Sequence, residues 1–389
     1  MSGGYRTSVG PEKRHSNEKE ITMRRARRVR GRATGIASMS AVAMLLVGCG
    51  SGGASETGSG SGGASNSAAA LTGQALVDAA KSEGAMTWYT SYTATETAAL
   101  IKKFNETYPG IKVTTLQGTA SDLAARLGTE QRGGTYNADL FQGDASYAKL
   151  LLNQGALLPY VPPDRPTPPE SLGLPSGYEN VDAVLTTVIA YNPAILKQMG
   201  LTPPTSLQDL TKPEWKGQFS ADYTAVNWYE SLIKSMGHDQ AKALIDALGN
   251  NSPRLVESHT LAITQVQSGE PAVSIAVYGY LAAKTAKKTP NQLAFINPSP
   301  LPSSPDLIDL VKNAPHPAAA ELFMTWLLSK EGQEAIHTIS GRISLSGDVT
   351  GQGDAWDEQK WTPAWAQPSL DPATINSYEE EMKEAFHAP

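Results

Sequence analysis

From Leu71 onward the sequence alternates short runs of strand-forming residues with segments that have helical periodicity. This alternation is typical of an α/β fold built on a mainly parallel sheet. Its first part predicts three strands, each followed by a helix, with the strands at residues 86–89, 111–116 and 138–141. Three such units in series predict one lobe, residues 71–180.

A second α/β pattern begins near Trp215, after a proline-rich stretch at 159–175 and an apolar run at 181–191. Prolines exclude a regular element from the stretch, and the apolar run is expected to link two lobes. Further strands are expected at 218–221, 254–257, 272–278 and 293–298, and helices at 228–248, 261–267 and 318–336. We therefore assign residues 181–310 to the hinge and the second lobe. Residues 311–389 are assigned to a return segment and C-terminal helices that pack on the lobes.

The length and the charge of the chain narrow its functional class. At 389 residues it exceeds the typical size of one domain, which favours a bilobal body. Residues 1–49 carry 10 Lys and Arg against 3 Asp and Glu, which leaves 22 against 35 for the rest, a net charge of −13. An acidic body argues against a nucleic-acid partner, because phosphates are bound by clustered Lys and Arg.

The amino-terminal segment, residues 1–49, is typical of an export signal that ends in a lipid attachment site. A run of arginines at 24–32 precedes an uncharged, largely apolar stretch at 33–48, and the only cysteine, Cys49, follows directly. This order is that of a secretory signal peptide, and the four residues ending in Cys49 resemble the lipobox of bacterial lipoproteins. Met23 is an alternative translation start. The other interpretation of Cys49 is a buried thiol.

Catalytic motifs are absent from the sequence. It contains no G-x-S-x-G, P-loop or H-E-x-x-H pattern, and its six histidines are scattered. The acidic pair Asp354 and Asp357 lies in a polar, glycine-rich stretch, where solvated carboxylates are more typical than the acid and base of a glycosidase. We therefore expect a binding protein rather than an enzyme.

Polar side chains follow several of the expected strands. In parallel α/β sheets, ligands bind at the carboxyl ends of strands, where helix amino termini offer unpaired N–H groups. The residues expected to converge on one cleft are Ser91, Tyr92, Asp144, Asp222, Tyr223, His259, Tyr278 and Tyr280. On an extended segment Tyr278 and Tyr280 face one side, whereas in a helical turn they diverge. The alternative for the hydroxyl residues, Ser91 among them, is helix capping.

Three segments of the chain resemble the extracellular solute-binding proteins of ABC importers. They are EGAMTWYTS at 83–91, LTKPEWKG at 210–217, and HPAAAELF through LSKEGQ at 316–333. The similarity covers about residues 80–345 and is greatest to the ferric-iron-binding branch, whose relatives also take up phosphonates and sugar phosphates. It implies a periplasmic-binding-protein fold of the second type, in which two crossing segments form a hinge and the solute is trapped between closing lobes.

The resemblance also implies candidate ligands. Asp144 occupies the position of an acidic residue that follows a strand in ferric-binding relatives. Those relatives use two adjacent tyrosines and often a histidine after the first strand. Here Gly279 separates Tyr278 from Tyr280, and Ser91 begins the first turn. If iron is the cargo, Asp144, Tyr278 and Tyr280 are the expected ligands; without the adjacent pair and the histidine, we favour a small anion.

The expected protein is thus an exported, monomeric lipoprotein that captures a small polar or anionic solute, or ferric iron. It delivers the solute to the permease and ATPase of an ABC importer. A lipid on Cys49 anchors it to the outer face of the cell membrane, and the Gly/Ser-rich residues 50–70 form a flexible tether. No resident cofactor is expected, and Fe3+ enters only as cargo. A ligand-sensing lipoprotein for a signalling partner and, less favoured, an exported hydrolase are the alternatives.

Overall fold

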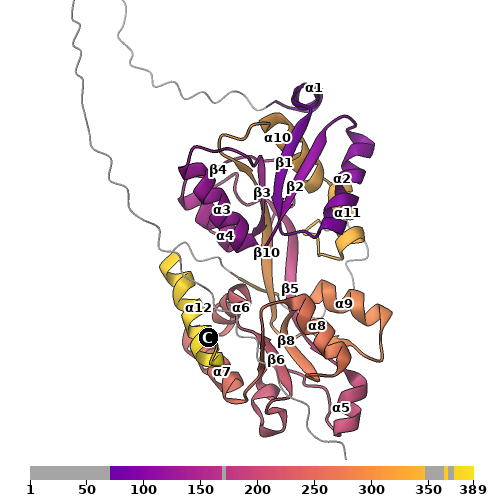
Figure 1. Ribbon diagram of the computed structural model, residues 1–389, viewed down its shortest axis with the longest axis vertical. Coiled ribbons are helices and arrows are strands. Elements are labelled where there is room, and N and C mark those ends of the chain that lie inside the picture. Colours follow the sequence, from indigo (N-terminus) through magenta and orange to yellow (C-terminus); the bar gives the residue numbers. More distant parts are fainter. Residues whose placement is uncertain (1–70, 169–171, 347–362, 367–371) are drawn as a thin grey trace, which may run out of the picture. The chain divides into compact units, whose positions relative to one another are not determined.

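Two long antiparallel strands, β5 (Val181–Tyr191) and β10 (Leu301–Val311), run through both lobes and join them (Figure 1). The computed structural model describes residues 71–168, 172–346, 363–366 and 372–389, all of which belong to one compact unit of the chain, residues 67–389. The strands are hydrogen-bonded in the order β2-β1-β3-β10-β5-β8-β6-β7. The two lobes are therefore the two ends of one sheet that shares its central strands.

Lobe 1 contains the three expected strand–helix units. Its parallel strands are β1 (Ala85–Thr90), β2 (Lys112–Gln117) and β3 (Leu140–Asp144). The helices that follow them are α2 (Ala94–Thr107), α3 (Ala120–Arg132) and α4 (Ala145–Asn153). Helix α1 (Gly73–Glu83) precedes β1, and the short β4 (Leu157–Leu158) pairs with β10. The sequence-based prediction of these units is confirmed.

Lobe 2 repeats the α/β pattern around three parallel strands, β6 (Phe219–Asp222), β7 (Arg254–Val256) and β8 (Val273–Tyr278). A further short strand, β9 (Ala294–Ile296), pairs with β5. Its helices are α5 (Pro193–Met199), α6 (Val226–Met236), α7 (His238–Asn250), α8 (His259–Ser268) and α9 (Gly279–Lys288). Two 3-10 turns, Gln208–Thr211 and Pro213–Trp215, connect α5 to β6.

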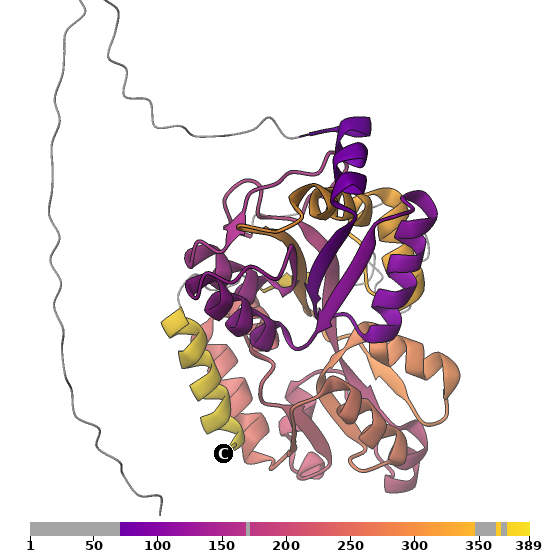
Figure 2. The same cartoon turned by 45° about the horizontal axis from the view of Figure 1, so that its top comes forward.

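The C-terminal part of the chain returns to both lobes. Helices α10 (Pro317–Leu328) and α11 (Lys330–Ser340) pack on lobe 1, and β11 (Pro363–Trp365) pairs with β10. Helix α12 (Pro372–Phe386), drawn in yellow, lies along α7 on lobe 2 in both views (Figures 1 and 2). No helix among the described residues combines the length and the apolar character needed to cross a membrane.

Both helices expected to be long are interrupted. The helix expected at 228–248 breaks at Gly237, whose φ of 85° and ψ of 153° suit glycine almost alone. The helix expected at 318–336 breaks at Ser329, which leaves the helical conformation and caps α11 by accepting a hydrogen bond from the Gly332 N–H. Strand β10 was not expected, because Pro302 and Pro305 argue against a central strand.

Strand β5 forms ladders with β10 and with β8, and each of these two ladders contains one irregularity. Between β5 and β10 the register shifts between Asp306 and Leu307, which leaves Asp182 as an extra residue of β5. Between β5 and β8 it shifts between Val188 and Ala190. Such β-bulges interrupt the ladder hydrogen bonds and bend the strand. The bends in the two ladders therefore fall on either side of the segment that joins the lobes.

An aromatic cluster fixes the helices of lobe 1 onto its sheet. The ring centroid of Phe323 lies 5.1 Å from that of Trp88, 4.9 Å from that of Phe104 and 5.8 Å from that of Trp326. The centroids of Phe104 and Trp326 are 5.5 Å apart. Aromatic pairs at this spacing stabilise by about 1 kcal/mol beyond their buried area. Because Trp88 is in β1 and Phe104 is in α2, the cluster holds the turn between these elements in place. That turn carries Ser91, the first of the expected site residues.

Candidate cleft between the lobes

A cavity of about 660 Å³ lies between the lobes, beside the crossing strands. Lobe 1 contributes Ser91, Thr93, Asp144, Ser146 and Tyr147; lobe 2 contributes Asp222, Tyr223, Asn227, Glu257, His259, Tyr278 and Tyr280. The crossing strands, the segment after α11, and α12 contribute Leu185, Asp306, Arg342, Ile375, Glu379 and Lys383. Seven of the eight expected site residues therefore share one cavity, as the strand-end argument predicts. A volume of this size suits a small molecule.

Asp144 joins the two lobes through hydrogen bonds. It ends β3 and caps α4: its Oδ1 accepts a 2.9 Å hydrogen bond from the Ser146 N–H. The Asn227 side chain, in α6 of lobe 2, donates to Asp144 Oδ2 and to Ser304 Oγ, both at 3.1 Å. Loss of solvation raises the pKa of Asp144, although these hydrogen bonds oppose the shift. Asn227 thus links lobe 2 to a carboxylate of lobe 1 and to β10.

The lobe 2 wall places a carboxylate beside a histidine. Asp222 ends β6, and its Oδ1 accepts hydrogen bonds from the N–H and the hydroxyl of Thr224 at 3.0 and 2.6 Å. Its Oδ2 lies 3.7 Å from Nδ1 of His259, the first residue of α8. Burial lowers the pKa of His259, against the opposing effect of Asp222, so the ring is neutral at pH 7. Tyr223 donates a hydrogen bond to Glu257.

A column of stacked groups runs along one wall of the cavity. The His259 and Tyr278 ring centroids are 3.7 Å apart, and those of Tyr278 and Tyr280 are 5.9 Å apart with planes inclined by 22°. The Arg342 guanidinium lies 4.8 Å from the Tyr280 centroid and 3.9 Å from that of Tyr92. Cation–π contacts at these distances stabilise by about 1 kcal/mol each, and more where water is excluded. The column therefore links α8, β8 and α9 of lobe 2 to the β1–α2 turn of lobe 1.

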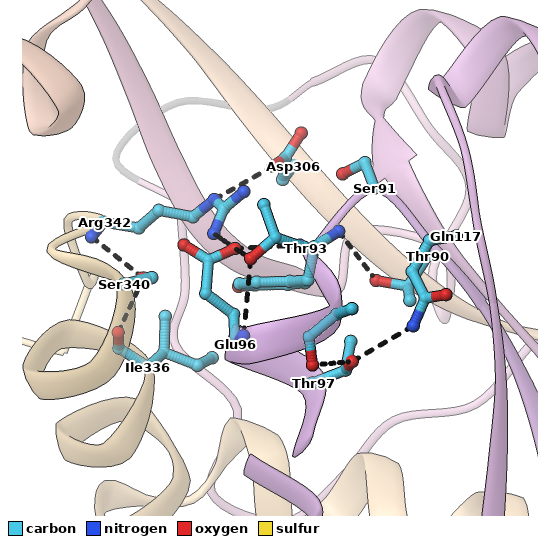
Figure 3. Close-up of polar contacts among 12 residues, drawn as sticks. Thr90, Ser91, Thr93, Glu96, Thr97, Gln117, Asp306, Ile336, Ser340 and Arg342 are labelled. Atoms are coloured by element: carbon cyan, nitrogen blue, oxygen red, sulfur yellow. Dashed lines mark hydrogen bonds and ion pairs between the residues drawn. The ribbon is translucent and has the colours of Figure 1, made fainter. Parts of the chain in front are cut away.

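Arg342 also contacts two carboxylates, as Figure 3 shows. Its Nη1 lies 3.2 Å from Glu96 Oε2, and its Nε lies 4.0 Å from Asp306 Oδ2. Glu96 in turn accepts from the Thr93 N–H and hydroxyl at 2.9 and 3.0 Å, which completes the cap of α2. Burial and the neighbouring Asp182 raise the pKa of Asp306 well above its usual range, and Arg342 opposes them. One guanidinium thus serves two buried carboxylates.

One of the expected site residues is placed differently from the prediction. Tyr92 is completely buried and does not line the cavity; its hydroxyl donates a 2.9 Å hydrogen bond to Asp182 Oδ2. Of these two neighbours, Ser91 lines the cavity and Tyr92 does not. Tyr280 is in the first turn of α9, yet its ring stacks on Tyr278 instead of diverging from it.

Several cavity residues were missed by the sequence analysis, among them Asn227, Glu257, Asp306, Arg342, Glu379 and Lys383. Their inclusion changes the composition of the site, because five acidic side chains line the cavity against two basic ones. The carboxylates are those of Asp144, Asp222, Glu257, Asp306 and Glu379. The cations are Arg342 and Lys383. Among the described residues, His, Cys, Asp and Glu do not come together in any group of three that could hold a metal ion.

Comparisons with known proteins agree with this architecture. Residues 87–334 match the family of bacterial extracellular solute-binding proteins. The chain is 28% identical over 248 residues to the Fe(3+)-binding periplasmic protein of Serratia marcescens. The aligned region covers 59% of this chain and 69% of that protein.

Solved structures show the same fold. Iron-bound HitA from Pseudomonas aeruginosa aligns with a TM-score of 0.66 at 23% identity, covering 77% of this chain and 99% of that one. AfuA from Actinobacillus pleuropneumoniae, with fructose-6-phosphate bound, aligns with a TM-score of 0.63 at 22% identity, covering 78% and 97%. The expected bilobal α/β fold of periplasmic binding proteins is confirmed.

Proposed function

Because the chain belongs to the family of bacterial extracellular solute-binding proteins and is the substrate-binding component of an ABC importer, we propose that it traps one small solute between its lobes. The observation that carries this proposal is the cavity of about 660 Å³, to which both lobes and both crossing strands contribute side chains. A solute that contacts both lobes favours the closed state and shifts the population toward it. The closed form then presents the solute to the permease.

The site residues of the proposal are Ser91, Asp144, Asp222, Tyr223, His259, Tyr278 and Tyr280, with Asp306 and Arg342 added. Binding without chemistry is supported by the relatives that the chain matches, which are named for binding.

Ferric iron is the second candidate solute, favoured by the relative in Serratia marcescens and by three oxygen donors in the cavity. These donors are the Asp144 carboxylate and the phenols of Tyr278 and Tyr280, and the two rings stack side by side. Burial, Asp306 and Asp144 raise the pKa of Tyr278 well above its usual range, so the phenol must lose its proton to the metal on binding. A bare anion has less support, because acidic side chains outnumber basic ones in the lining of the cavity.

The membrane anchor of the proposal is a lipid on Cys49, which lies outside the described residues together with the signal and the tether. The sequence order of arginines, apolar stretch and cysteine supports it. More than one acyl chain is expected, since one chain alone binds a membrane reversibly. In the Cys49→Ala variant the protein should leave the membrane fraction of cells. Retention and processing as in the parent would contradict the anchor.

The binding role itself is tested on natively purified protein. Mass spectrometry under native conditions should detect one retained small solute per chain. Small-angle scattering should show a larger radius of gyration after the solute is removed, because the lobes then open. A radius of gyration that stays the same with and without a confirmed solute would refute closure, and a surface-bound solute would refute the assignment of the cleft.

A further inference from the structure

Two carboxylates of the cavity lie directly opposite each other in the sheet. Asp144 of β3 and Asp306 of β10 are register partners in the antiparallel β3–β10 ladder. Side chains of direct partners extend from the same face of a sheet, with Cβ atoms about 4.5–5.5 Å apart, and like charges at such positions repel. Both side chains line the cavity between the lobes. The crossing strand therefore brings two acidic groups together where a solute enters.

The positive charge available to this pair is small. Asp144 is bonded only to neutral donors, the Ser146 N–H and the Asn227 amide. Asp306 is 2% exposed, and its Oδ2 has no hydrogen-bond partner among the described residues. The nearest cation, Arg342, is 4.0 Å from that oxygen and lies closer to Glu96, at 3.2 Å. One acceptor of a buried carboxylate at the cavity thus lacks a donor.

Burial of such an atom costs about 1–3 kcal/mol unless a donor is supplied. Among the described residues its Oδ2 accepts no hydrogen bond, although the Gln142 side chain and Arg342 lie close enough to lower the pKa of Asp306, and the neighbouring Asp144 raises that pKa. A ligand group that donates hydrogen bonds and carries positive charge would satisfy this oxygen and favour the ionised form of Asp306, whose pKa burial and Asp182 raise. A protonated amine is small enough to lie between two cross-strand partners and donates N–H groups at about 2.7–2.9 Å from carboxylate oxygens.

We propose that Asp144 and Asp306 form a subsite for a protonated amino group of an organic solute. This inference rests on the proposed binding function and narrows its substrate class. The rest of the cavity fits such a solute: Asp222, Glu257 and Glu379 add negative charge, and His259 is neutral at pH 7. Lys383, which also lines the cavity, could pair with a carboxylate of the same solute.

The experiment compares matched variants of the full chain by calorimetry. The cationic probes are ethanolamine, 1,4-diaminobutane and lysine; the controls are citrate, glucose 6-phosphate and ferric citrate. At least one amine should bind. Asp306→Asn and Asp144→Asn should each weaken it by roughly 10- to 100-fold, the loss of one charge-assisted hydrogen bond. Asp239→Asn, a fully exposed carboxylate of α7, should leave the affinity unchanged.

Three results would overturn the subsite: binding only of citrate, glucose 6-phosphate or ferric citrate; no binding of any amine; or amine affinities that neither substitution changes. Circular dichroism monitors folding, and Asp144→Asn carries the test independently if Asp306→Asn misfolds. Tight binding of an anionic or ferric probe with lobe closure would remove the amine subsite and leave the import function intact. A chain that retains no solute and does not close with any probe would contradict the function itself.

Discussion

Asp309 provides a measurable link between burial and pH-dependent stability. This residue of β10 is 1% exposed, and its Oδ1 accepts a 3.3 Å hydrogen bond from the Asn180 amide. Its Oδ2 has no hydrogen-bond partner among the described residues. Burial raises the pKa of Asp309 to about 8; the nearby Asp182 adds to the shift, and Asn180 and Arg165 oppose it. The carboxyl group is therefore protonated in the folded protein at pH 7.

The sign of the effect follows from proton uptake. The unfolded chain loses this proton above a pKa of about 3.9, whereas the folded chain keeps it up to about pH 8. Between these values folding binds a proton, so the free energy of unfolding falls as pH rises, by about 1.4 kcal/mol per pH unit. The loss is complete above the folded pKa, and stability is fully regained below the unfolded pKa.

Asp309→Asn removes this dependence, because an amide has the shape of the protonated acid and does not ionise. The free energy of unfolding of the variant, relative to the parent, should therefore increase by about 4 kcal/mol between pH 5 and pH 8. Urea unfolding followed by tryptophan fluorescence on solute-free protein measures the difference at each pH. Asp239→Asn, on an exposed side chain, is the control and should show no trend. A difference for Asp309→Asn that stays constant over this range would refute the raised pKa.

Three further substitutions test separate contacts. Asn227→Ala removes the donor that joins Asp144 and Ser304 across the lobes and costs about 1 kcal/mol; solute-free protein should then show a larger radius of gyration by scattering. Arg342→Met leaves Glu96 and Asp306 without their shared cation, and thermal unfolding should show a loss of about 3–5 kcal/mol. Gly237→Ala adds a methyl group at a position with space for it, but residue 237 has a φ of 85°, which strains any residue other than glycine; urea unfolding should therefore show destabilisation by about 1–3 kcal/mol.

The parts of the fold that could be predicted are those fixed by local periodicity. Period-2 runs followed by helical periods predicted the three units of lobe 1, and parallel topology then brought their carboxyl ends together. This is why Ser91, Asp144, Asp222, His259 and Tyr278 share one cavity, although they are far apart in the sequence.

The residues that could not be predicted depend on the course of the chain between elements. Asp306 is in the middle of a strand that two prolines concealed, and Arg342 is in a short segment after α11 that no periodicity describes. Tyr92 follows a strand as Ser91 does, but the turn directs it inward to Asp182. Tyr280 enters a helix and still meets Tyr278, because the chain bends where β8 ends and α9 begins.

The bulge at Asp182 of β5, which lies opposite Asp306 of β10, bears on how fast a solute can leave. In β10 the register with β5 shifts immediately after Asp306, and Asp306 also lines the cavity. The bulged strand bends at such a place, so a solute bound to Asp306 contacts the crossing strands beside this bend and not only one of the two lobes. We therefore expect the dissociation of the solute to be coupled to the opening of the lobes. A substitution that makes this bend of the crossing strands less flexible should lengthen the residence time of the solute, although it changes no atom that contacts the solute.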